Sequence, residues 1–75
     1  MRYLYVTFEQ QLFSEEVGYY RIYGIQCRTA VSEETLAVFQ DVSTDRLLME
    51  ELARRCTQGQ LSPIHLMDVI LDVLD

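Results

Sequence analysis

The sequence predicts a small α+β domain, in which a three-stranded antiparallel meander is followed by two helices packed on one face of the sheet. Three observations lead to this fold class. Residues 3–9 alternate with the two-residue period of a strand. Residues 19–28 and 35–42 are rich in aromatic and β-branched side chains, which favour strands. From residue 43 onward the apolar side chains recur with helical spacing.

Length and cysteine content describe a domain with a thin margin of stability. The 75 residues are expected to form one domain, with the sheet in 1–42 and the helical pair in 43–75. A chain of this size buries only about 60–65% of its unfolded surface, so small domains often depend on a disulfide, a metal or a partner. Cys27 and Cys56 form no recognisable zinc or redox motif and follow no secretory signal. We expect both thiols to be reduced and buried.

The first strand has two chemically different faces. One face carries Leu4, Val6 and Phe8, and the other carries Tyr3, Tyr5, Thr7 and Glu9. The alternation is lost after Glu9, and Ser, Glu and Gly residues follow, so residues 10–18 are expected to form a loop. Leu12 and Phe13 are expected to anchor that loop on the core.

The alternation of the second strand changes parity at Gly24. Tyr20 and Ile22 share one parity, whereas Ile25 and Cys27 share the other. A β-bulge at Gly24 would let all four side chains face the core. Close packing of another group against the glycine is a comparable alternative. The third strand is apolar on both faces in its middle, so we expect it to lie centrally or under a helix.

The first helix has the pattern of an ordinary amphipathic surface helix. Ser43 is expected to be its N-cap, with Asp45 in the first turn and Gly59 as the C-terminal stop. Its apolar residues fall within an arc of about 140°, which is expected to face the core. They are Leu48, Met49, Leu52, Ala53 and Cys56.

The second helix begins after Ser62, with Pro63 at its first position, and is apolar over most of its circumference. Its apolar residues sweep about 220°, twice what a helix lying on a sheet needs. The polar residues are His65, Asp68, Asp72 and Asp75. One side consists of Ile64, Met67, Leu71 and Leu74, with Ile70 beside them. Of the two apolar sides, one can meet the sheet and the other the first helix. The side expected to stay partly exposed consists of Leu66, Val69 and Val73.

This surplus of apolar surface predicts a homodimer that forms through the second helix. Three exposed Leu or Val side chains forgo more burial energy than a domain of this size can spare. Packing against a symmetry mate recovers that energy, and a two-fold dimer is the commonest closed solution. The interface candidates on this helix are Leu66, Val69, Ile70 and Val73.

A second candidate interface is rich in tyrosine. Tyr3, Tyr5 and Tyr23, with Tyr19 and Arg21 near them, are predicted to line the sheet face away from the helices. Three interpretations stay open: aromatic pairs that stabilise the sheet, a protein-binding surface, and a stacking platform for single-stranded nucleic acid. The net charge of −6 argues against the last of these.

Several classes of function are disfavoured by the sequence. No apolar run approaches the ~20 residues of a membrane span, and the N-terminus alternates like a strand rather than a signal peptide. The single histidine, the lack of a nucleophile elbow and the lack of a glycine-rich loop argue against an enzyme. His65, Asp68 and Asp72 could offer ligands to a metal, but a solvated polar stripe accounts for the same pattern. We expect no catalytic residue, no cofactor and no metal.

Part of the sequence resembles a known family. The segment DVSTDRLLMEELARRCTQGQLSPIHLMDVILDVL, preceded by YGI in the second strand, is similar to short uncharacterised proteins from clostridial-type Firmicutes. The most specific part is LSPIHLMDVILDVL, at residues 61–74. The resemblance implies a bacterial cytoplasmic protein and carries no activity, cofactor or catalytic residue with it.

These observations together predict a small non-catalytic protein-interaction or regulatory module of a bacterial cytoplasm. We expect it to form a homodimer and to have a further protein partner, but to bind neither nucleic acid nor membrane. The alternative is a ligand- or metal-responsive binding domain. That domain would use either the face of His65, Asp68 and Asp72 or the tyrosine-rich face of the sheet.

Overall fold

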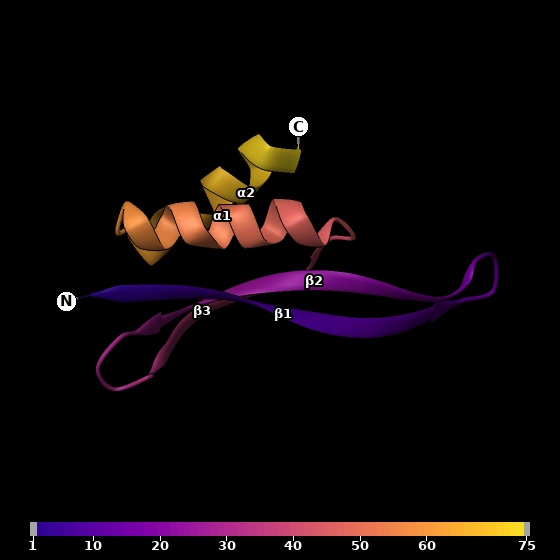
Figure 1. Cartoon of the computed structure of the whole chain (residues 1–75), viewed down its shortest axis with the longest axis horizontal. Helices are drawn as coiled ribbons and strands as arrows, with labels where there is room; N and C mark the ends of the chain where they lie inside the picture. Colours follow the sequence, from indigo (N-terminus) through magenta and orange to yellow (C-terminus); the bar gives the residue numbers. More distant parts are fainter. Residues whose placement is uncertain (1, 75) are drawn as a thin grey trace.

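The fold is a three-stranded antiparallel sheet with both helices on one side of it, as Figure 1 shows. The computed structural model describes residues 2–74. The elements in chain order are β1 (Tyr3–Ser14), β2 (Gly18–Thr29), β3 (Thr35–Ser43), α1 (Arg46–Gln58), the 3-10 helix η1 (Pro63–His65) and α2 (Leu66–Leu74). The strands lie in the order β1-β2-β3, and α1 packs along the sheet. The predicted meander followed by two helices is confirmed.

β1 and β2 form a hairpin that is longer than the sequence pattern predicted. Only residues 15–17 form the turn, which Gly18 closes in a left-handed conformation at φ 78°. Phe13 lies opposite Tyr19, with the ring centroids 5.1 Å apart, and such cross-strand pairs continue the ladder to the turn. The loop predicted after Glu9 is therefore wrong. The hairpin instead extends past the helices as a two-stranded arm, on which Phe13 is exposed (Figure 1).

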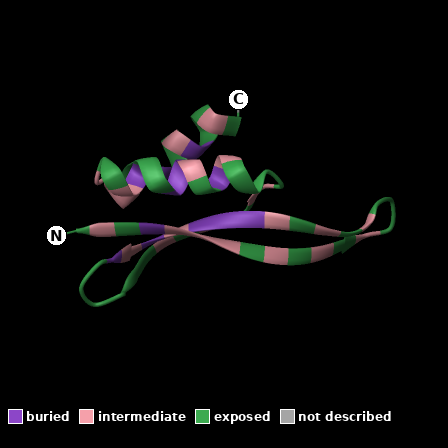
Figure 2. Ribbon diagram, in the orientation of Figure 1, coloured by how far each residue is buried: buried purple, intermediate pink, exposed green. Residues whose placement is uncertain are grey.

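The core lies between the helices and the sheet face that carries the odd-numbered residues of β1 and β2 (Figure 2). Its buried residues are Tyr5, Tyr23, Ile25, Cys27, Met49, Leu52, Ala53, Cys56, Leu66 and Ile70. The tyrosine face of β1 therefore meets the helices, and the face of Leu4, Val6 and Phe8 is open. The expected orientation is wrong because a tyrosine ring buries as much apolar surface as an aliphatic side chain when its hydroxyl finds a partner.

Gly24 is a point of close approach rather than a bulge in β2. The pairing of β1 with β2 continues through Gly24 without a shift, and Phe8 lies opposite it. A Cβ atom added to Gly24 would overlap the Phe8 ring and lie 2.5 Å from the carbonyl oxygen of Phe39. The irregularity is in β3, which places residues 40–42 opposite Gly24 alone and contains Asp41 at φ 54°. Close packing is confirmed, and the bulge that would turn all four side chains inward is wrong.

α1 begins and ends with different residues from those expected. Asp45 is the N-cap, and its carboxylate accepts a hydrogen bond of 3.0 Å from the backbone N–H of Leu48. Ser43 instead accepts a bond from the backbone N–H of Asp45. A carboxylate satisfies this position well because the helix N-terminus carries partial positive charge. After the helix, the left-handed residue is Gln60 at φ 50°, whereas Gly59 keeps a right-handed conformation.

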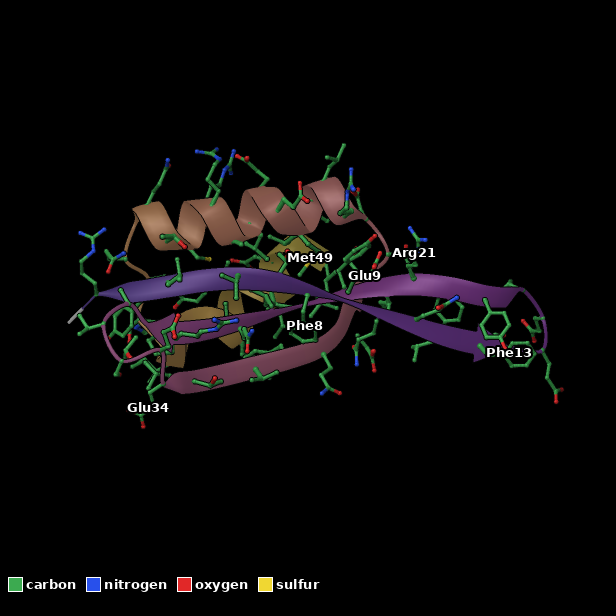
Figure 3. All side chains as sticks on the ribbon, turned by 60° about the horizontal axis from the view of Figure 1, so that its bottom comes forward. Phe8, Glu9, Phe13, Arg21, Glu34 and Met49 are labelled. Carbon is green, nitrogen blue, oxygen red and sulfur yellow. The ribbon has the colours of Figure 1, made fainter. Side chains whose placement is uncertain are left out.

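The inward face of α1 is the one that its periodicity predicted. Met49 lies between the helix and the sheet, as Figure 3 shows, and it is fully buried. Three more residues of the predicted arc are buried with it, and Leu48 is half-buried. The outward face carries surface ion pairs, in which Glu51 binds both Arg54 and Arg55. These hydrogen bonds hold the pKa of Glu51 below its usual value.

Candidate interaction surfaces

The wide apolar arc of α2 is divided between the core and solvent. Leu66 and Ile70 are buried in the core, and Val69 and Val73 are half-buried beside α1. Four apolar residues remain exposed, with exposed fractions between 48% and 79%. These four, which we call the outer stripe, are Ile64, Met67, Leu71 and Leu74.

The division of α2 differs in part from the one expected from the sequence. The predicted interface candidates Leu66, Val69, Ile70 and Val73 are the ones that face inward. Val69 and Val73 are partly exposed as expected, whereas the expectation for Leu66 is wrong because it is fully buried. The larger exposed area belongs to the other side of the helix, which forms the outer stripe.

The outer stripe has the spacing of a helix-packing seam. Its members follow one another at i, i+3, i+7 and i+10. This is the a/d pattern through which two helices pack side by side. The flank of the stripe carries His65, Asp68 and Asp72, all three exposed. Asp75, which the sequence placed on the same flank, lies outside the described residues.

An apolar groove of about 290 Å³ separates the C-terminal half of α1 from α2. Its walls are formed by Leu52, Arg55, Cys56, Gly59, Leu61, Val69 and Val73. Arg55 is the only charged residue among them, and its guanidinium is bonded to Glu51. Cys56 is nearly buried, and burial raises the pKa of its thiol. The groove therefore offers shape and apolar contact, but little polar recognition.

Of the four tyrosines predicted to form an exposed surface, three lie on the core side of the sheet, and Tyr19 is exposed on the hairpin arm. Tyr5 is only 4% exposed, Tyr23 is also buried, and Tyr3 packs against the core. The Tyr5 hydroxyl donates a hydrogen bond of 2.6 Å to the carbonyl oxygen of Leu61, which ties β1 to the segment before α2. The Tyr23 hydroxyl donates to Glu9 at 3.1 Å. These tyrosines hold the fold together, so they are unavailable as an exposed interface or stacking platform.

Burial also explains the titration behaviour of this interior. Burial raises the pKa of Tyr5, and the neighbouring Cys27 raises it further. Burial likewise raises the pKa of the Cys27 thiol. For Tyr23, burial raises the pKa first and the hydrogen bond to Glu9 adds to it. The raised pKa values extend to higher pH the range over which these three groups stay neutral.

The outer edge of β1 is covered by side chains from the end of α1. The Gln60 amide accepts from the backbone N–H of Tyr3 at 2.8 Å and donates to its carbonyl at 3.1 Å. The Thr57 hydroxyl accepts from the backbone N–H of Tyr5 at 3.0 Å. The outward backbone groups of two edge residues thus have hydrogen-bond partners of the kind that a neighbouring strand would provide. Sequence reasoning missed Thr57 and Gln60, because nothing in their spacing shows that they reach β1.

The sheet face away from the helices is apolar and uncovered within residues 2–74. It carries Leu4, Val6 and Phe8 of β1, together with Leu36 and Val38 of β3. Leu36 and Val38 keep 38% and 46% of their surface exposed. Within residues 2–74, apolar side chains are thus exposed both on α2 and on this face of the sheet.

Comparison with known proteins identifies the family of this chain. A family of unknown function, DUF6514, matches residues 1–75. The chain belongs to the DUF6514 family. The match includes the N-terminal hairpin, which lay outside the resemblance noted from the sequence. Comparison with curated proteins and with solved structures gives no significant match.

Two further observations limit the site chemistry of this DUF6514 chain. Among residues 2–74, no three His, Cys, Asp or Glu side chains are placed to hold a metal ion together. His65, Asp68 and Asp72 share a solvated flank but do not converge on one point. In the same part of the chain, no helix is long and apolar enough to cross a membrane.

Proposed function

We propose that this DUF6514 protein is a small non-catalytic interaction module that self-associates through α2. The observation that supports the proposal is the outer stripe, four large apolar side chains in an a/d pattern on one exposed helix face. The resemblance to clostridial proteins and the unpaired thiols favour a bacterial cytoplasmic setting, where thiols stay reduced. In such a setting a binding module of this size would act as an adaptor or regulator.

The position of α2 leaves the outer stripe accessible to a second copy. α2 crosses behind α1, and its C-terminal end points away from the sheet (Figure 1). No other element within residues 2–74 covers this side, since Leu71 and Leu74 keep half or more of their surface exposed. An antiparallel α2 pair would place Met67 against Leu71 of the other copy at its centre. Ile64 would lie near Leu74 of the other copy at each end.

Electrostatics support the antiparallel arrangement. Asp72 lies near the C-terminal end of α2, where a negative charge opposes the helix dipole. In an antiparallel pair, Asp72 of one copy lies near the N-terminal end of the other α2, on the flank that carries His65. The partial positive charge of that end would stabilise the carboxylate.

The expected affinity is modest. Full burial of a large aliphatic side chain contributes about 1.5–3 kcal/mol, and roughly half of that is still available at each stripe residue. Eight such residues in a dimer contribute about 8 kcal/mol before the cost of association, which is at least about 4 kcal/mol. Flanking contacts add to the remainder, so we expect a dissociation constant between about 10 μM and 1 mM.

The proposal is tested by Leu71→Glu, with Leu47→Glu as the matched control. Leu47 is an exposed leucine on α1, outside the stripe, so its variant carries the same change without altering the seam. Sedimentation equilibrium should show self-association for the wild type and for Leu47→Glu, and a monomer for Leu71→Glu. A wild type that stays monomeric at about 1 mM refutes the proposal. A Leu71→Glu variant that is folded and still dimeric places the contact elsewhere.

A further inference from the structure

The two edges of the sheet differ in how their backbone groups are satisfied. On the β1 edge, Gln60 and Thr57 bind the backbone of Tyr3 and Tyr5. Natural sheets block their edges in such ways because an open row of N–H and C=O groups binds other strands. β3 forms the opposite edge, and within residues 2–74 no side chain or loop bonds to the outward groups of its residues 35–40.

The register identifies the outward-facing residues of β3. Since the N–H groups of Tyr3 and Tyr5 point outward, the even-numbered residues of β1 form the hydrogen-bonded pairs with β2. Because backbone direction alternates along a strand, the N–H and C=O groups of Ile25 and Cys27 in β2 then point toward β3, where these residues lie opposite Phe39 and Ala37. In the regularly paired part of β3, between its two register shifts, the backbone groups that point outward are those of Val38. We call the side of residues 35–40 that faces away from β2, centred on Val38, the open edge.

The open edge lacks the usual protective devices along its middle. Residues 35–40 contain no charged residue and no proline. The register of β3 with β2 shifts on both sides of this middle part, between Thr35 and Ala37 and again between Phe39 and Ser43, where Asp41 adopts φ 54°. The exposed side chains of Leu36 and Val38 lie directly beside the open backbone groups, on the uncovered face of the sheet. An added strand would therefore gain both hydrogen bonds and apolar contact.

The charges around β3 determine what kind of strand fits. Glu33 and Glu34 precede β3 and Asp41 lies near its other end, all three exposed (Figure 3 labels Glu34). A second copy paired antiparallel about Val38 would bring Glu34 beside Asp41 of the other copy, which is repulsive. A segment with basic residues at both ends would instead meet carboxylates at both ends, whichever way it runs.

We propose that the β3 edge docks an extended, basic segment of a partner protein, which adds a fourth strand to the sheet. The hydrogen bonds would come from the open edge, and the acidic residues at its two ends would select the charge. The partner segment would place small apolar side chains over Leu36 and Val38. This site is separate from the outer stripe of α2, so it holds or fails independently of self-association.

The test uses a synthetic peptide, acetyl-Lys-Arg-Thr-Val-Thr-Val-Thr-Arg-Lys-amide, and an acidic twin with Glu at the four basic positions. Binding is followed on the full chain by amide NMR shifts and by amide hydrogen exchange. We expect the basic peptide to bind with a dissociation constant of about 1 mM or below and to slow amide exchange within residues 35–40, most of all at Val38. Affinity should fall by at least about tenfold for the acidic twin, and it should weaken with added salt.

Val38→Pro removes one outward N–H without removing a bond to β2, as edge strands tolerate. The matched control is Thr7→Pro, which removes an outward N–H from the β1 edge. Val38→Pro should abolish binding, and Thr7→Pro should leave it intact. If either proline variant fails to fold, Val38→Lys should weaken binding at least about tenfold and Leu47→Lys should not.

Four results of the peptide experiments would overturn the proposal. The first is that the basic peptide shows no detectable binding at about 10 mM, and the second is that both peptides bind equally well. The third is that the peptide protects amides of the β1 edge or of α2 instead of the open edge. The fourth is that the Val38 variants bind the peptide as well as the wild type does. Protection of the open edge without peptide, growing with protein concentration, would also overturn it. That result would identify the occupant as a second copy of this chain.

Discussion

Replacing Thr57 by valine tests whether the end of α1 really covers the edge of β1. The two side chains have nearly the same shape, and their helix propensities are similar, so α1 itself should be unaffected. The change removes the hydroxyl that accepts the 3.0 Å bond from the backbone N–H of Tyr5. That N–H is partly buried, and a buried donor left without a partner costs about 1–3 kcal/mol. Partial access to water favours the lower half of that range.

We therefore expect Thr57→Val to lower the free energy of unfolding by about 1–2 kcal/mol. For a domain of this size that corresponds to a fall in Tm of about 4–16 °C. The assay is urea and thermal unfolding at fixed protein concentration, combined with hydrogen exchange at the Tyr5 amide. Thr44→Val is the control, since Thr44 is exposed and should change stability by less than about 0.5 kcal/mol. A Thr57→Val variant with wild-type stability and an equally protected Tyr5 amide would refute the reasoning.

Two further predictions follow from the packing of the core. Gly24→Ala should lower the free energy of unfolding by about 1–3 kcal/mol, because the added methyl meets an aromatic ring and a backbone carbonyl. Gly59→Ala is its control, because Gly59 has a right-handed φ and an added Cβ would lie 3.3 Å from the carbonyl oxygen of Arg55, a much milder contact. In urea unfolding the control should lose clearly less stability than Gly24→Ala, and equal losses would contradict this account. The second prediction concerns pH: folding raises the pKa values of Cys27, Cys56 and Tyr5, so the folded protein keeps protons that the unfolded chain has released. The free energy of unfolding should be unaffected by these groups below about pH 8 and should fall as the pH rises through and above the unfolded values of about 8.5 and 10. Urea titrations between about pH 7 and 10.5 test this, and Tyr5→Phe should reduce the fall above about pH 10; a flat profile would contradict it.

The order and type of the elements could be predicted because their signals are local. Period-two alternation, the helical recurrence of apolar residues and the proline at the start of the second helical segment each depend on a few neighbouring residues. The inward face of α1 was predicted for the same reason, since its arc is narrow and only one orientation buries it. Cys27 and Cys56, predicted to be buried free thiols, are free and buried in the structure.

The errors concern choices that local signals leave open. The alternation of β1 does not show which of its two faces is buried, because Tyr3 and Tyr5 are as able to fill a core as Leu4 and Val6. The structure selects the tyrosines, since the Tyr5 hydroxyl reaches the carbonyl of Leu61 across the chain. The hairpin arm was missed because Gln10 and Gln11 interrupt the alternation of β1. Pairing with β2 stabilises this part of the strand, although its own sequence does not indicate a strand.

α2 shows most clearly which features the sequence determines and which depend on tertiary packing. The sequence by itself determined that about 220° of this helix is apolar, and that one layer of contacts cannot cover it all. It could not determine which part is covered, because a wide arc contains two nearly equivalent stripes. The docking of α2 against α1 and the sheet buries Leu66 and Ile70 and leaves Met67 and Leu71 exposed. That choice depends on the direction in which the chain leaves α1, a long-range geometric constraint that no local pattern of residues encodes.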